Sequence, residues 1–246
     1  MSTWAAQAGA SVRLEWGPAA IEHLAGGVDC VVVVDVMSFS TCVDVAVARG
    51  ARVYPYAWRD ASALAYARER GAEVASTDRR LAEGWSLSPT SLASVPAGLK
   101  LVLPSPNGSS IAFAARERGA AVFCGGLRNR AATARACAAF ERILVVACGE
   151  RWPDGSLRPA LEDLMGAGGI VAALDRADAS AEARAAALAY EALGADRHAA
   201  LGDCASAREL VERGFAADVA LCLDEDASGV AARLEGDCFV VAASAA

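Results

Sequence analysis

The run Cys30-Val31-Val32-Val33-Val34-Asp35 decides the fold class, because four consecutive valines ending at a carboxylate are typical of a buried strand. A second continuous apolar run covers residues 143–147. Strands that are apolar on both faces occur mainly in parallel sheets covered by helices on both sides. These two runs therefore favour an α/β fold.

Helical patterns alternate with strand-like runs on either side of this segment. Basic residues followed by glycine mark three changes from helix to strand, at Gly50, Gly71 and Gly119. The expected strands are 30–35, 51–56, 73–76, 100–103, 121–124, 143–147 and 238–242, and the expected helices are 40–49, 59–70, 109–118, 130–140, 161–175, 181–193 and 206–213. This alternation predicts one domain over residues 1–246, an α/β layered fold with a largely parallel or mixed sheet flanked by helices. Residues 177–205 are expected to form a helical excursion at one edge.

Composition excludes several classes of protein. The 246 residues carry 23 basic and 30 acidic side chains, a net charge of −7, and 55% are hydrophobic. The hydrophobic content excludes wholesale disorder, and the acidic balance argues against nucleic acid as a partner. No apolar stretch approaches the roughly 18 residues of a membrane span, so we expect no membrane partner.

Cysteine and histidine usage bears on compartment and metal type. The eight cysteines form no CxxC pair, and the first 17 residues lack the basic-then-apolar pattern of a secretory signal. We therefore expect buried free thiols and a cytoplasmic protein. The two histidines argue against a histidine-built zinc site.

Ligands of open α/β sheets collect beyond the carboxyl ends of the strands, so the loops that follow the strands are the candidate sites. The first such loop begins at Asp35, whose charge at the end of a buried strand needs a partner. A carboxylate here can hold a cation, and the free N–H groups of the following helix can hold an anion. For Ser40 and Thr41, the role of an ordinary helix N-cap is favoured over binding of an anion.

The next two loops give less specific sequence signals for a binding or catalytic site. Asn107, Gly108 and Ser109 follow the expected strand 100–103 and can cradle a phosphate, but they also suit a turn with an N-cap. Cys124 and Arg130 have the Cys-x5-Arg spacing of cysteine-dependent phosphatases. Because Ala131 stands where Ser or Thr commonly follows the Arg, a buried Cys124 is favoured over a nucleophile.

The fourth loop follows strand 143–147 and contains Glu150, after which Glu162 and Asp163 open an apolar helix. Acidic residues in a first helical turn are stabilising without any further role. Two adjacent carboxylates after a strand are also what a Mg²⁺ site uses. The small residues 166–169 predict close packing of this helix or a nearby ligand.

The four loops, in this order, resemble the 2-phosphosulfolactate phosphatase family. The resemblance rests on five segments: Asp35-Val36-Met37-Ser38-Phe39-Ser40-Thr41; Ser105-Pro106-Asn107-Gly108-Ser109; Arg128-Asn129-Arg130-Ala131; Cys148-Gly149 with Glu162-Asp163 and Ala167-Gly168; and Leu210, Gly214, Asp218 and Val219. It covers nearly the whole chain from about residue 28. It implies a Mg²⁺-dependent phosphatase that acts on a small anionic 2-phospho acid, in a pathway towards coenzyme M or related sulfonates.

Two departures bear on the substrate. The family has Arg where this chain has Ser38, and the family segment Gly-Glu-Arg is similar to Ser76-Thr77-Asp78-Arg79, which lacks the Glu. An arginine lost from an anion pocket removes a bidentate clamp. The substrate can therefore differ from that of the family, and loss of activity stays open.

We hypothesise that Mg²⁺ is bound by Asp35, Glu162 and Asp163, that it polarises the phosphoryl group, and that Glu150 is the base. The predicted binding residues for the substrate are Ser38, Ser40, Thr41, Asn107, Gly108, Ser109, Arg128 and Asn129, with Arg128 assigned to a second anionic group. A non-catalytic member that binds a phosphorylated metabolite, or an enzyme of specialised metabolism that uses the same phosphate site, is the alternative. Assembly into a homo-oligomer stays open.

Overall fold

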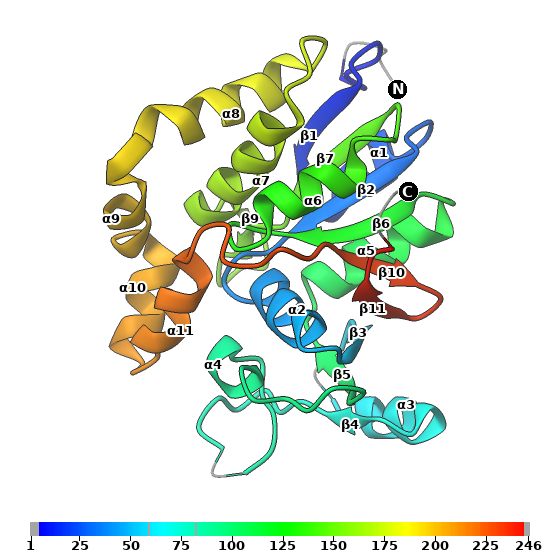
Figure 1. Ribbon diagram of the computed structural model, residues 1–246, viewed down its shortest axis with the longest axis vertical. Coiled ribbons are helices and arrows are strands. Elements are labelled where there is room, and N and C mark those ends of the chain that lie inside the picture. Colours follow the sequence, from blue (N-terminus) through cyan, green and yellow to red (C-terminus); the bar gives the residue numbers. More distant parts are fainter. Residues whose placement is uncertain (1–4, 59, 82, 244–246) are drawn as a thin grey trace.

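A nine-stranded mixed sheet organises the chain (Figure 1). The computed structural model describes residues 5–58, 60–81 and 83–243. The strand order is β1-β7-β2-β6-β10-β11-β3-β5-β4. The first four strands are mutually parallel, as are the last three, and the antiparallel hairpin of β10 and β11 joins the two groups. The expectation of an α/β fold with a largely parallel or mixed sheet is confirmed.

The sheet strands are β1 Val12–Trp16, β2 Cys30–Val34, β3 Arg52–Tyr56, β4 Glu73–Val74, β5 Lys100–Pro104, β6 Ala121–Gly125, β7 Ile143–Ala147, β10 Ala232–Glu235 and β11 Cys238–Val241. A separate small hairpin pairs β8 (Glu150–Arg151) with β9 (Leu157–Arg158). The helices are α1 Gly17–Leu24, α2 Phe39–Ala48, α3 Ser62–Arg70, α4 Pro89–Leu92, α5 Gly108–Glu117, α6 Arg130–Cys137, α7 Leu161–Leu174, α8 Ala181–Leu193, α9 Arg197–Gly202, α10 Ala205–Glu212 and α11 Ala216–Leu223, with the 3-10 turn η1 at Gly194–Asp196.

The valine run of β2 shows why the helices divide between two faces. Val31 and Val33 pack into one apolar core with α1, α2 and α5, whereas Val32 and Val34 pack into a second core with α6, α7 and α8. This division follows from the alternation of side chains along a strand. Each buried valine contributes about 1.5–3 kcal/mol relative to exposure. The central strand is therefore fixed in register by apolar side chains on both faces.

All seven expected strands and all seven expected helices occur, with ends shifted by up to three residues. The helix expected over 59–70 begins at Ser62, and residue 59 lies outside the described residues. The sequence analysis missed β1 and β10, which each carry two charged residues in a short edge or hairpin strand, the two-residue strands β8 and β9, and the helices α1, α4 and α11. Their short length and mixed polarity give weak periodicity.

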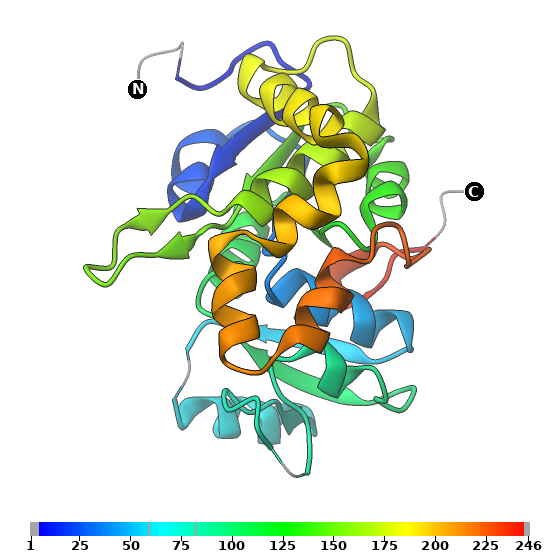
Figure 2. The same ribbon diagram turned by 90° about the vertical axis from the view of Figure 1, so that its left-hand side faces the viewer.

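Helices α8 to α11 form an arm that runs from the β1 edge down to the ends of the central strands (Figure 2). Its start confirms the expected helical excursion over 177–205. The close packing expected at residues 166–169 is found here, since a Cβ on Gly168 would lie 2.2 Å from the carbonyl oxygen of Ala186 in α8. A larger residue at this position would force α7 and α8 apart.

Within the described ranges, no helix has both the length and the apolarity needed to cross a bilayer.

Candidate active site

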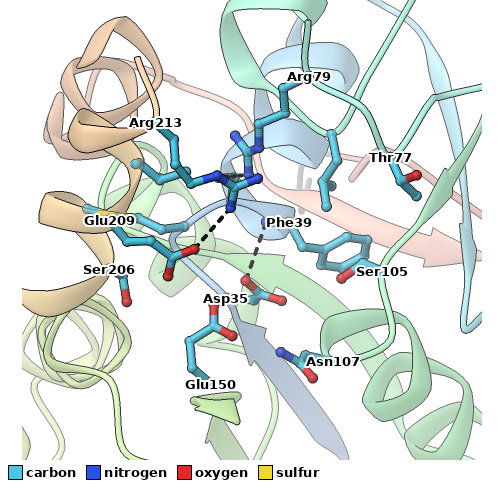
Figure 3. A pocket seen from close by; sticks show the side chains of 14 residues that line it. Asp35, Phe39, Thr77, Arg79, Ser105, Asn107, Glu150, Ser206, Glu209 and Arg213 are labelled. Atoms are coloured by element: carbon cyan, nitrogen blue, oxygen red, sulfur yellow. Dashed lines mark hydrogen bonds and ion pairs between the residues drawn. The ribbon is translucent and has the colours of Figure 1, made fainter. Parts of the chain in front are cut away.

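A cavity of about 180 Å³ lies where the loops after β2, β4, β5 and β7 meet helix α10 (Figure 3). Its walls come from segments that are far apart in the sequence. The lining residues are Asp35, Met37, Ser38, Phe39, Thr77, Arg79, Leu87, Ser105, Asn107, Glu150, Ser206, Glu209, Leu210 and Arg213. The first, second and fourth loops singled out from sequence therefore reach one place, and the third does not.

One end of the cavity is acidic. Asp35 lies directly after β2, is 7% exposed, and accepts a hydrogen bond from the backbone N–H of Phe39 at 3.4 Å. Figure 3 shows the carboxylate of Glu150 beside that of Asp35. Burial raises the pKa of Glu150 to about 7, and the negative charges of Asp35 and Glu162 add to the rise. This end of the cavity is suited to holding a cation or a proton.

Asp163 holds two of the cavity loops together. Its Oδ1 accepts from the N–H of Val36 at 2.7 Å and its Oδ2 accepts from the N–H of Gly149 at 2.8 Å. Burial raises the pKa of Asp163, and the charges of Glu162 and Asp35 raise it further. The neighbouring Glu162 is also buried and accepts from the Sγ of Cys204 at 3.3 Å. Neither Glu162 nor Asp163 lines the cavity.

These contacts bear on the predicted magnesium ligands. Among the residues that the structure describes, no group of three or more His, Cys, Asp or Glu side chains is placed to hold a metal ion. Asp35, Glu162 and Asp163 are therefore not found as one ligand set, and each oxygen of Asp163 accepts from a backbone amide. Mg²⁺ is commonly held by only one or two carboxylates together with waters and substrate oxygens. The donor set of the cavity, with Asp35 and Glu150 on one side, fits that mode, and Mg²⁺ itself stays a prediction.

The other end of the cavity holds two arginines, with Glu209 beside them. Arg79 donates through Nη1 to Oδ2 of Asp218 at 2.7 Å and through Nη2 to Oγ of Ser38 at 2.9 Å. Arg213 pairs with Glu209 at 3.0 Å on helix α10. Figure 3 shows that both arginine side chains extend towards the cavity from the side opposite Glu150. Two arginines, each paired with an acid, thus lie across a small space from Asp35 and Glu150.

Most hydroxyls predicted to bind phosphate make internal hydrogen bonds. Ser40 accepts from the N–H of Asp35 at 2.9 Å, Thr41 donates to the carbonyl of Val36 at 2.8 Å, and Ser109 accepts from the N–H of Tyr56 at 3.0 Å. All three are buried, and none lines the cavity. These side chains hold the backbone of the loops in place.

Ser38, Asn107 and Gly108 have different positions. Ser38 and Asn107 line the cavity, and the amide of Asn107 donates to the carbonyl of Gly149 at 3.4 Å. Gly108 is required by close packing, since a Cβ there would lie 2.2 Å from Cδ1 of Phe39. Of the residues predicted to bind substrate, the structure therefore brings only Ser38 and Asn107 to the cavity.

The loop after β6 is held by ion pairs and hydrogen bonds outside the cavity. Arg128 pairs with Asp44 at 3.1 Å and with Asp224 at 3.2 Å, and Asn129 accepts from the N–H of Gly126 and donates to the carbonyl of Cys124. Neither Arg128 nor Asn129 lines the cavity. Burial raises the pKa of the Cys124 thiol, which fits the interpretation of Cys124 as a buried residue.

Sequence reasoning missed Arg79 and Arg213 as cavity residues. Arg79 lies in the segment that is similar to the family's Gly-Glu-Arg, so the resemblance held a signal for it. Arg213 follows the last turn of α10, where a basic residue is ordinary, and no motif distinguishes it.

Comparison with known proteins agrees with this arrangement. The family model described as 2-phosphosulpholactate phosphatase matches residues 19–237, which span every loop of the cavity. No curated protein matches the chain in a sequence comparison. Because the family match covers most of the chain and includes the acidic and basic ends of the cavity, the protein belongs to the 2-phosphosulpholactate phosphatase family, a family of phosphoric monoester hydrolases.

Proposed function

We propose that the protein hydrolyses a small phosphate monoester that carries a second anionic group, as 2-phosphosulfolactate does, with Mg²⁺ as cofactor. The observation that carries the proposal is the two-sided cavity of about 180 Å³, with Asp35 and Glu150 at one end and Arg79 and Arg213 at the other. Phosphoryl transfer depends mainly on positioning and on neutralising charge, and this arrangement offers both.

Asp35 would be the ligand of Mg²⁺ in this proposal, with the buried Glu162 and Asp163 outside the cavity lining. When bound, the ion would neutralise the phosphoryl oxygens and make the attack of water easier. The contacts of Asp163 with the loops at Val36 and Gly149 keep Asp35 and Glu150 on the same side of the cavity.

Glu150 would accept the proton of the attacking water. Its pKa of about 7 is near the optimum for a base that works at neutral pH. Arg79 and Arg213 would receive the second anionic group of the substrate, the role that the sequence analysis gave to Arg128. Asn107 faces the centre of the cavity in Figure 3 and would donate to a substrate oxygen.

The test is phosphate release from a panel of 2-phosphosulfolactate, 2-phospholactate, 2-phosphoglycolate, sugar phosphates and ethyl phosphate, with Mg²⁺ and then with a chelator. We expect turnover of at least one 2-phospho acid, its loss with chelator, and its loss in Asp35→Asn and Glu150→Gln. Asp224→Asn is the matched control, because Asp224 is an exposed acid that pairs with Arg128. Tight binding of the acids by the wild type without turnover of any of them would favour a non-catalytic binding protein.

A further inference from the structure

Asp218 on helix α11 is a buried carboxylate with four hydrogen-bond donors. Oδ1 accepts from Ser88 Oγ at 2.6 Å, from Thr90 Oγ1 at 2.5 Å and from Thr90 N–H at 3.1 Å, and Oδ2 accepts from Arg79 Nη1 at 2.7 Å. The side chain of Asp218 is 2% exposed and does not line the cavity described above. One oxygen thus binds the start of α4, and the other binds the guanidinium of a cavity residue.

The charge of Asp218 needs an explanation beyond anchoring of α4. Burial of a carboxylate is costly, and a neutral amide or hydroxyl can accept from Ser88 and Thr90 equally well. The partner that does require a full negative charge is Arg79, whose side chain is only 11% exposed. The pair is therefore a buried ion pair at the wall of the cavity.

Arg79 is fixed on more than one side. Its second terminal nitrogen donates to Ser38 Oγ at 2.9 Å, and its Cζ lies 5.6 Å from the centre of the Phe215 ring. A free arginine side chain carries about 2 kcal/mol of rotamer entropy, which a ligand must overcome if the side chain is not already held. The hydrogen bonds to Asp218 and Ser38 use two of the five N–H groups of the guanidinium, so a guanidinium held in this way can still donate to a ligand.

We propose that Asp218 is a positioning residue of the active site, which holds the Arg79 guanidinium in the orientation that receives the second anionic group of the substrate. The inference rests on the proposed function, because it assigns to Arg79 a contact with that substrate. The inference goes further, because it makes a residue outside the cavity a determinant of substrate selectivity. Asp218 favours phosphate monoesters that carry a second anionic group over monoesters that lack one.

The experiment compares the 2-phospho acid of highest kcat/KM with ethyl phosphate, which lacks the second anionic group. Loss of an oriented charge-assisted contact predicts that Asp218→Asn raises KM for the acid by about 10- to 100-fold, with little change in kcat. KM for ethyl phosphate is expected to change by less than about twofold. Arg79→Gln is expected to give the same pattern, and the double variant is expected to be no worse than Arg79→Gln alone.

Two further variants separate positioning from stability. Ser88→Ala with Thr90→Val removes the two hydroxyl contacts with α4 and leaves the ion pair, so we expect a lower Tm with an unchanged KM for the acid. Asp218→Glu keeps the charge but shifts it by one methylene, and we expect a smaller rise of KM that is again confined to the acid. This variant also decides the matter if Asp218→Asn does not fold.

Equal changes of KM for both substrates, or additive effects of Asp218→Asn and Arg79→Gln, would show that Asp218 acts only on stability and would overturn the inference. Calorimetric binding of 2-phosphosulfolactate to the wild type and to Asp218→Asn keeps the two proposals apart. Absence of turnover by the wild type contradicts the proposed function alone. Equal affinity of the wild type and Asp218→Asn contradicts the role of Asp218 whether or not turnover occurs.

Discussion

Two buried aspartate–arginine pairs lie in the molecule, and only one of them forms part of the cavity wall. Arg79 with Asp218 forms part of the cavity wall, whereas Arg128 with Asp44 joins the loop after β6 to helix α2. Both arginines are largely buried, at 11% and 13% exposure of their side chains. Burial and ion pairing therefore do not distinguish Arg79 from Arg128. The two arginines differ in that only Arg79 lines the cavity.

The largest contrast is expected between Asp35, which lines the cavity, and Asp44, which pairs with Arg128 outside it. Asp35→Asn is expected to lower kcat/KM by about 10³-fold or more, because it removes the proposed metal ligand. Asp44→Asn is expected to leave kcat/KM within about threefold and to lower the free energy of unfolding by about 3 kcal/mol, since it leaves Arg128 without its buried partner. The measurements are steady-state kinetics with Mg²⁺ and urea unfolding. A similar loss of activity in both variants would contradict the assignment of Asp35 to the active site and of Asp44 to a structural ion pair.

The next largest effect on activity is expected for Glu150. Glu150→Gln is expected to lower kcat/KM by about 10²- to 10⁴-fold, the usual contribution of a positioned base. The base must be deprotonated, so the kcat/KM of the wild type is expected to fall as the pH drops below about 7. Bound Mg²⁺ would shift that limb to lower pH, because it offsets the charge of Asp35. A residual activity of Glu150→Gln with an unchanged acidic limb would exclude Glu150 as the base.

Glu150 also predicts how stability depends on pH without metal. Its pKa is about 7 in the folded protein against 4.5 as the ordinary value, so the folded state binds the proton more tightly between these pH values. The free energy of unfolding is therefore expected to decrease as the pH rises from 4.5 to 7, with a contribution from this residue of about 3 kcal/mol. Urea unfolding of the wild type and of Glu150→Gln at pH 5 and pH 8, with chelator, measures this contribution to the free energy of unfolding. The variant is expected to show the weaker pH dependence, and an equal dependence in both proteins would contradict the account.

The smallest effect is expected at Cys124. Cys124→Ser is expected to change kcat/KM by less than about twofold, because burial keeps this thiol protonated and away from the cavity. The free energy of unfolding is expected to fall by about 1–3 kcal/mol, as a buried polar group replaces the thiol. A large loss of activity without loss of stability would restore the Cys-x5-Arg interpretation.

The sequence predicted the fold well, because β2 and β7 are continuous apolar runs and because glycines mark the ends of the helices. It predicted Asp35 and Glu150 at one cavity because both follow strands of one parallel group. It did not predict Arg79 or Arg213, whose positions depend on how the loop after β4 and helix α10 fold back over the sheet. No local sequence pattern predicts this packing between distant segments of the chain. For the same reason, Arg128 was expected to bind substrate, although it lies close to the acids Asp44 and Asp224.

The most direct test of the account compares Arg79→Gln with Arg128→Gln at matched substrate and Mg²⁺ concentrations. We expect Arg79→Gln to lower kcat/KM for the 2-phospho acid by about 10- to 100-fold through KM, which corresponds to the loss of a charge-assisted contact. Arg128→Gln is expected to leave kcat/KM within about threefold and to lower the free energy of unfolding by about 3 kcal/mol, because it leaves Asp44 unpaired. The opposite result, with activity lost at Arg128 and kept at Arg79, would contradict the assignment of the active site to this cavity.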